Sequence, residues 1–177
     1  MKRLLPLILI VMLVLPLAAQ DADLPEQITI QSPGLMPEGI AWDAENARFL
    51  VGSLSQGTVN AVADDGTLTA FSQDEALLSS VGIEVDAENG RLLVANSNSA
   101  LFTGSVPEGP LALLGAYDLA TGEQLFMADL TDLTGDAYGP THFANDVAVD
   151  AEGNAYVTDT LSPVVYKVDM AGNAEVF

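Results

Sequence analysis

Residues 144–160 read ANDVAVDAEGNAYVTDT. Apolar side chains alternate with other residues up to Val149, the segment Asp-Ala-Glu-Gly-Asn follows, and a second alternating run begins at Ala155. Alternation with a period of two is typical of a strand with one buried face, and a short segment rich in Asp, Gly and Asn between two such runs is typical of a hairpin turn. This stretch therefore predicts an antiparallel β-hairpin.

The same pattern occurs twice more in the chain. Residues 37–53 read PEGIAWDAENARFLVGS, and residues 80–97 read SVGIEVDAENGRLLVANS. A second strand-turn-strand pattern comes after the hairpins, for example TVNAVADDGTLTAF from Thr58 and VVYKVDMAGNAEVF from Val164. Units of four strands that recur at roughly 40 to 50 residues, with no convincing helix between them, indicate the blades of a β-propeller.

We therefore expect an all-β fold with three four-stranded blades, near residues 35–74, 75–139 and 140–177. The second unit is longer because an additional segment rich in Gly, Pro and Ser, residues 100–114, interrupts it. Insertions of this kind usually lie on one face of a repeat array, often the binding face, and the alternative is a loop without a function. Because a closed ring needs about 4 to 8 blades, we expect the chain to be part of a larger propeller. A homodimer that closes the ring is the alternative if the polypeptide ends at residue 177.

The start of the chain has the features of an export signal. Lys2 and Arg3 precede an uncharged apolar run over residues 4–17, and two small residues, Ala18 and Ala19, follow it. We expect residues 1–20 to be a signal peptide and residues 21–177 to form a secreted domain. The sequence contains no cysteine, so the core or a bound ion has to stabilise this domain without disulfides.

The charge of the chain limits its partners. Without the expected signal peptide, three basic residues face 25 acidic residues, which gives a formal net charge of −22. Such a surface repels phosphate backbones, so we expect no nucleic-acid partner. No second apolar run of spanning length follows residue 20, so we expect no membrane partner once the signal is removed. We expect a small-molecule substrate or ligand as the partner. The acidic surface is consistent with a hard cation such as Ca²⁺ as a ligand, and equally with a charge that merely keeps a secreted protein soluble.

The repeat register identifies candidate metal ligands. The aspartates of the three turns are Asp43, Asp86 and Asp150, and the residues five positions earlier are Glu38, Val81 and Asn145. In a propeller this position begins the innermost strand of a blade, at one end of the central channel. Carboxylate and amide oxygens are the ligands that Ca²⁺ prefers, and Asp146 is placed to orient them. The alternative is that Glu38 and Asn145 are ordinary solvated turn residues.

The segments PEGIAWD and FANDVAVDAEGNAYVTD, with their blade-length spacing, resemble the six-bladed propellers of the SMP-30/gluconolactonase/LRE-like group over residues 33–177. Paraoxonases and strictosidine-synthase-like proteins are relatives of this group. The resemblance covers the N-terminal portion of such a propeller. It implies that Glu38 and Asn145 bind a divalent cation, foremost Ca²⁺, in the central channel.

The resemblance also implies hydrolysis of lactones or related esters. In that group the remaining ligands and the proposed general base come from later blades, so no catalytic residue is assigned here and no organic cofactor is expected. A non-catalytic extracellular propeller that binds a ligand or a protein partner remains the alternative, because a fold alone does not determine an activity.

Other polar and aromatic residues have more than one interpretation. His142 is either a general acid or base or, as we favour, a loop histidine that forms hydrogen bonds. Asn96 and Asp159 end comparable strands and either line the channel or hold a turn. We expect five aromatic side chains to pack between blades, namely Trp42, Phe49, Tyr117, Phe126 and Tyr156.

Overall fold

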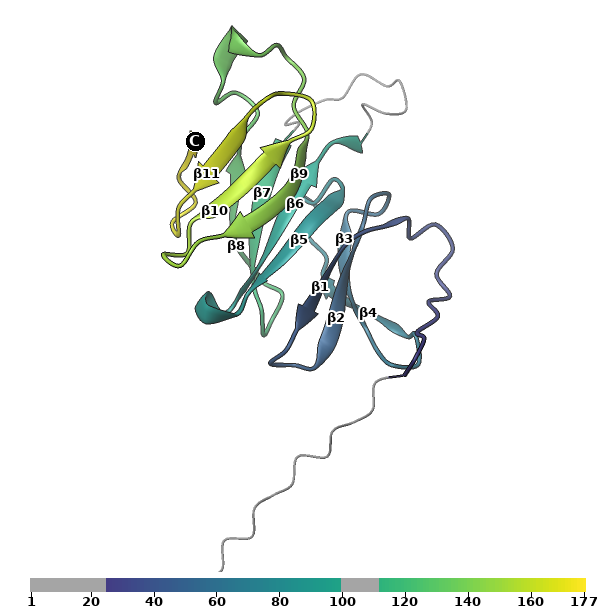
Figure 1. Ribbon diagram of the computed structural model, residues 1–177. Helices are drawn as coiled ribbons and strands as arrows, with labels where there is room; N and C mark the ends of the chain where they lie inside the picture. Colours follow the sequence, from purple (N-terminus) through teal and green to yellow (C-terminus); the bar gives the residue numbers. More distant parts are fainter. Residues whose placement is uncertain (1–24, 100–111) are drawn as a thin grey trace, which may run out of the picture.

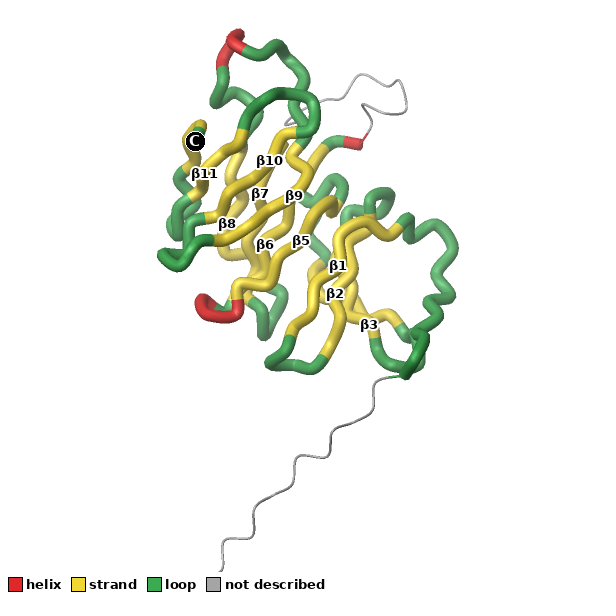
Figure 2. Tube along the Cα trace, viewed as in Figure 1, coloured by secondary structure: helices red, strands yellow, loops and turns green. Residues whose placement is uncertain are grey.

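The computed structural model describes residues 25–99 and 112–177. The expected signal peptide and residues 100–111 of the insertion lie outside these described residues. Within them, strands account for nearly all regular structure, and helical geometry is confined to short 3-10 turns (Figure 2). No helix in this part of the chain is both long enough and apolar enough to cross a membrane.

The strands form three separate four-stranded antiparallel sheets, which confirms the prediction of a partial β-propeller (Figure 1). The first blade consists of β1 (Pro37–Asp43), β2 (Arg48–Ser53), β3 (Thr58–Val62) and β4 (Leu68–Ser72). The second consists of β5 (Ser80–Asp86), β6 (Arg91–Ser97), β7 (Ala112–Asp118) and β8 (Gln124–Asp129). The third consists of β9 (Ala144–Val149), β10 (Ala155–Asp159), β11 (Val165–Val168) and β12 (Ala174–Val176).

Strand order in each blade follows chain order, so β1, β5 and β9 are the first strands of their sheets. Neighbouring blades meet through these strands, β1 with β5 and β5 with β9, and the second strands β2 and β6 also contact β5 and β9 (Figure 1). The strands β1, β5 and β9 are therefore the inner strands, as the register predicts. The repeated Asp-Ala-Glu segments form the turns after all three of them.

Most of the core lies between the blades, and a smaller cluster of Leu35, Val51 and Val62 packs with the segment before the first blade. Between the first and second blades the core contains Leu50, Val59, Ile83, Leu92, Val94 and Tyr117, among others. Between the second and third blades it contains Val81, Leu93, Leu114, Val147, Val157 and Tyr166, among others. Because each sheet buries apolar side chains against its neighbour, the hydrophobic effect fixes the blades side by side.

The turn aspartates also join the first two blades to their neighbours. Asp43 Oδ2 accepts a hydrogen bond of 2.9 Å from Arg48 Nε, and Arg48 Nη2 donates to the carbonyl of Leu119 in the second blade at 2.8 Å. Arg48 also lies 5.1 Å above the Phe71 ring. The arginine thus spans the junction between two blades.

The second blade repeats this arrangement. Asp86 Oδ2 accepts from Arg91 Nε at 2.8 Å, and Arg91 Nη2 donates to the carbonyl of Gly153 in the third blade. In the third blade Ala155 stands at the arginine position, and the hydroxyl of the next residue, Tyr156, donates to Asp150 of the same hairpin at 3.0 Å. The arginine connection is therefore a feature of the two junctions between described blades.

Two of the five aromatic side chains pack between described blades, as predicted, and the other three lie on faces that no described blade covers. Tyr117 and Phe126 do pack between blades. Trp42 and Phe49 instead stack with ring centroids 4.7 Å apart on the face of the first blade that points away from the second. Tyr156 contacts Phe177 on the outward face of the third blade, with centroids 4.9 Å apart. Their neighbours along each strand face the described core, so strand alternation directs these rings to the other side.

Candidate functional site

The inner strands approach one another most closely next to the predicted ligands. A Cβ atom at Gly39 would lie 2.1 Å from the carbonyl oxygen of Val81, and one at Gly82 would lie 2.4 Å from that of Asn145. Gly39 directly follows Glu38, and Gly82 directly follows Val81. The fold therefore brings Glu38, Val81 and Asn145 to neighbouring places on three adjacent strands.

The carboxyl group of Glu38 is the most unusual feature of this region. The residue is half-buried, and its Oε2 atom is buried without any hydrogen-bond partner. Burial, and then the negative charge of Asp146, raise the pKa of the Glu38 carboxyl above its ordinary value. Buried polar atoms are nearly always paired, so this carboxylate oxygen is a hydrogen-bond acceptor that the described residues leave free for a ligand.

Asp146 contributes charge from the third blade. It stands where the other inner strands have Gly39 and Gly82, and it is exposed. Its Oδ1 accepts from the backbone N–H of Val147 at 2.9 Å. The pKa of the Glu84 carboxyl is also raised, first by the burial of Glu84 and then by the charge of Asp146. The channel end of the inner strands is thus strongly negative.

Asn145 lies half-buried at the start of β9, and its carboxamide makes no hydrogen bond to the described residues. Together with Glu38 it offers two hard oxygen donors of the kind that Ca²⁺ takes, while Ca²⁺ needs about 6 to 8 in total. Within residues 25–99 and 112–177, no three His, Asp or Glu side chains are grouped to hold a metal ion. A cation held by Glu38 and Asn145 would complete its shell with water and with oxygen atoms beyond these two residues.

Val81 offers no ligand. Its side chain is 1% exposed and packs in the core between the second and third blades. Val81, the second-blade equivalent of Glu38 and Asn145, therefore has a structural role.

His142 has the hydrogen-bonding role that the sequence favours. The ring is buried, and its Nδ1 lies 2.8 Å from Asp159 Oδ2. The hydroxyl of Tyr166 donates to the same Asp159 oxygen at 3.0 Å, and burial with this contact raises the pKa of Tyr166. The group connects the loop before β9 to β10 and β11.

Asp159 holds that loop through its second oxygen. Oδ1 accepts from the backbone N–H groups of Phe143, Leu161 and Ser162 at 2.9–3.1 Å. Burial alone would raise the pKa of Asp159, but the hydrogen bonds from Phe143, His142, Leu161 and Tyr166 outweigh it and lower that pKa. Asp159 is thus part of the frame that positions Asn145.

Asn96 occupies the equivalent place in the second blade. Its Oδ1 accepts from the N–H groups of Leu78 and Ser79 at 2.8 and 3.2 Å, and its Nδ2 donates to the carbonyl of Ala76 at 2.7 Å. Asn96 and Asp159 therefore hold the loops before the inner strands and do not line the channel. The sequence signal for this role is a polar residue at the end of the second strand of each unit.

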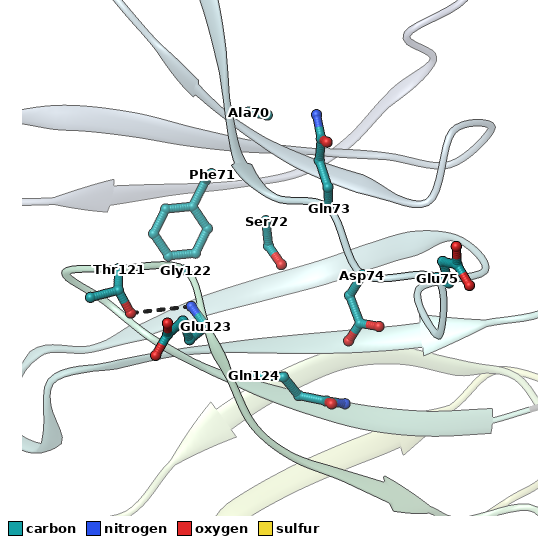
Figure 3. A pocket seen from close by; sticks show the side chains of 10 residues that line it. All are labelled: Ala70, Phe71, Ser72, Gln73, Asp74, Glu75, Thr121, Gly122, Glu123 and Gln124. Atoms are coloured by element: carbon teal, nitrogen blue, oxygen red, sulfur yellow. Dashed lines mark hydrogen bonds between the residues drawn. The ribbon is translucent and has the colours of Figure 1, made fainter.

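A cleft of about 760 Å³ lies away from the inner strands. It is formed by β4, the loop after β4 and the turn before β8 (Figure 3). Its walls are mostly polar, and Asp74, Glu75 and Glu123 give it a negative charge. Asp74 accepts hydrogen bonds from the buried hydroxyl of Tyr117 at 3.0 Å and from the N–H of Ala76 at 2.9 Å. These contacts give Asp74 a structural role, and the cleft offers no unpaired buried group.

The fold is similar to those of several solved structures. A streptogramin B lyase has a TM-score of 0.61 at 13% identity, covering 85% of this chain and 43% of that chain. A candidate gluconolactonase has a TM-score of 0.59 at 14% identity, covering 83% and 50%. A chain of a nidogen/laminin complex has a TM-score of 0.55 at 17% identity, covering 80% and 46%.

At these identities the similarity shows the fold alone. No protein-family model matches the sequence, and no curated protein matches it. The chain spans half or slightly less of the length of these solved structures. It therefore has a β-propeller fold of the kind found in gluconolactonase-like proteins and lyases, over part of their length.

Proposed function

We propose that this chain forms part of a secreted, divalent-cation-dependent hydrolase of lactones or related esters. The observation that carries the proposal is the buried, unpaired Oε2 of Glu38 on an inner strand, two inner strands away from Asn145. The similarity of the inner-strand segments to those of gluconolactonase-like proteins supports the same assignment. The expected signal peptide and the acidic, cysteine-free composition support secretion.

The described residues fit a hard cation chemically. When bound, a divalent cation polarises a carbonyl group and lowers the pKa of water. Glu38 would bind such an ion through the oxygen that has no partner, and Asn145 would contribute its amide oxygen. Asp146, held by the Val147 N–H, would add negative charge that strengthens cation binding. No described residue is assigned as the general base.

The test is an assay of lactone hydrolysis with the full-length protein, with calcium and with a chelator. We expect turnover of a γ- or δ-lactone to require the cation. Glu38→Gln and Asn145→Ala should each lower activity at least tenfold, whereas Glu88→Gln, on an exposed turn, should leave it unchanged. Hydrolysis that persists in both site variants and in the chelator would contradict the proposal.

A non-catalytic propeller that binds a ligand or a protein is the second candidate. The observation in its favour is that one of the solved structures with a similar fold is a chain of a nidogen/laminin complex. A protein that binds calcium but turns over no lactone in this assay would support the second candidate over the first.

A further inference from the structure

A second unpaired polar atom lies beside the Glu38 site. The side chain of Ser80 is fully buried, and its Oγ has no hydrogen-bond partner. Among the described residues, Ser80 Oγ and Glu38 Oε2 are the two buried side-chain polar atoms in this condition. Leaving a buried hydroxyl unpaired is unfavourable, so its presence needs an explanation.

Both residues flank the same glycine. Glu38 pairs with Gly52 across β1 and β2. A Cβ atom at Gly52 would lie 3.0 Å from Ser80 Cβ and 3.4 Å from the backbone oxygen of Glu38. Ser80 therefore faces the first blade at the level of Glu38, across the junction between β5 and the β1–β2 hairpin.

The strand geometry explains why Ser80, and not Val81, faces this point. The pairing of β5 with β6 shifts between Ser80 and Ile83, and that of β1 with β2 shifts between Glu38 and Ile40. Such irregularities redirect side chains at strand ends. Val81 turns into the core between the second and third blades, whereas the Cβ of Ser80 lies against Gly52 of the first blade.

We propose that the second blade contributes to the cation site through Ser80. The Ser80 hydroxyl forms a hydrogen bond to a water molecule that coordinates the ion bound by Glu38. This inference rests on the proposed function, because it requires a cation at Glu38. A bound water would give the Ser80 hydroxyl the partner that the protein does not provide, and waters at such sites typically make 2–4 hydrogen bonds. Ser80 is then a positioning residue, since it acts on the ion through water.

The test compares Ser80→Ala with wild type and with Ser79→Ala, using calcium titrations and thermal unfolding of the full-length protein with and without a chelator. Ser79 is the matched control, because it is an adjacent buried serine whose hydroxyl has a partner, Ser99 Oγ at 2.8 Å. In chelator, Ser80→Ala should be as stable as wild type or more stable, since it removes an unpaired group. Ser79→Ala should be less stable and should bind calcium as wild type does.

With calcium, the Ser80→Ala variant should bind at least about tenfold more weakly than wild type, and its melting temperature should rise less. Ser80→Cys should behave in the same way, because a thiol is close in size to a hydroxyl but forms only weak hydrogen bonds to water. This variant replaces Ser80→Ala if the alanine variant does not fold. Wild-type affinity in the Ser80 variants, with binding lost in Glu38→Gln, would overturn this inference and leave the proposed function standing. Absence of calcium binding by wild type would overturn both.

Discussion

Arg91 connects the second and third blades by hydrogen bonds. It is 2% exposed, pairs with the buried carboxylate of Asp86, and reaches the backbone of the third blade at Gly153. The spacing Asp-x-x-Asn-x-Arg is visible in the sequence at both arginine-bearing turns. The reach of the guanidinium into the next blade is not visible there, because it depends on how the sheets are stacked.

Replacing Arg91 with Met should destabilise the protein by about 3–5 kcal/mol, because the Asp86 carboxylate would remain buried without its cationic partner. Urea unfolding measures this cost. The double variant Asp86→Asn with Arg91→Met should cost less than the single variant, since no unpaired charge remains. Equal costs for the two variants would show that the arginine acts through packing alone.

Asp159 should control part of the acid sensitivity of the fold. Its pKa is lowered in the folded protein, so its ionised form stabilises the fold at neutral pH, and this contribution is lost as the pH falls below about 4. Asp159→Asn should be less stable than wild type at pH 7. The difference in melting temperature between wild type and Asp159→Asn should become smaller as the pH is lowered from about 5 to about 2. A constant difference across this range would contradict the assignment.

Among single residues, Glu38 and Asn145 can be predicted as candidate metal ligands from their position in the sequence repeat alone. The sequence does not predict that Glu38 Oε2 and Ser80 Oγ lack partners, because a missing hydrogen bond depends on the three-dimensional surroundings of an atom. His142 could be assigned to hydrogen bonding from its place in a loop. Its partner Asp159 could not be identified, because the two residues meet only when β9 and β10 pair.

At the scale of elements, close approach of the inner strands is what assembles the site. Gly39→Ala should disturb the contact of β1 with β5, because its Cβ would lie 2.1 Å from the Val81 oxygen. Gly90→Ala is the matched control, since Gly90 also has a positive φ but nothing within 4 Å of the added atom.

Both glycine variants should lose stability through backbone strain, by about 1–2 kcal/mol. Gly39→Ala should lose at least about 2 kcal/mol more in urea unfolding and should also weaken calcium binding. Equal destabilisation of the two variants would mean that β1 and β5 can separate without cost.

The hairpins could be predicted because each has alternating apolar residues and a turn with its own side-chain hydrogen bonds. Asp43, for example, accepts from the Asn46 side chain at 2.8 Å. Alternation gives each strand two faces but does not say which neighbour covers each one, and Trp42, Phe49 and Tyr156 lie on faces that no described blade covers.

For the whole molecule, the dominant property is charge. The chain carries 25 acidic and 5 basic residues, a formal net charge of −20. Mutual repulsion of these charges destabilises a compact state, and salt screens it, with a Debye length of about 10 Å at 0.1 M and about 3 Å at 1 M. Raising sodium chloride from low concentration towards 1 M should therefore increase the melting temperature, and a decrease would contradict this view.

The central claim is that the channel end of the inner strands binds a divalent cation through Glu38. The most direct measurement is calorimetric titration of calcium into the full-length wild-type protein and the Glu38→Gln variant, at an ionic strength fixed with sodium chloride so that screening is equal. We predict saturable binding to wild type that is lost or at least tenfold weaker in Glu38→Gln. Indistinguishable titrations of the two proteins would contradict the account.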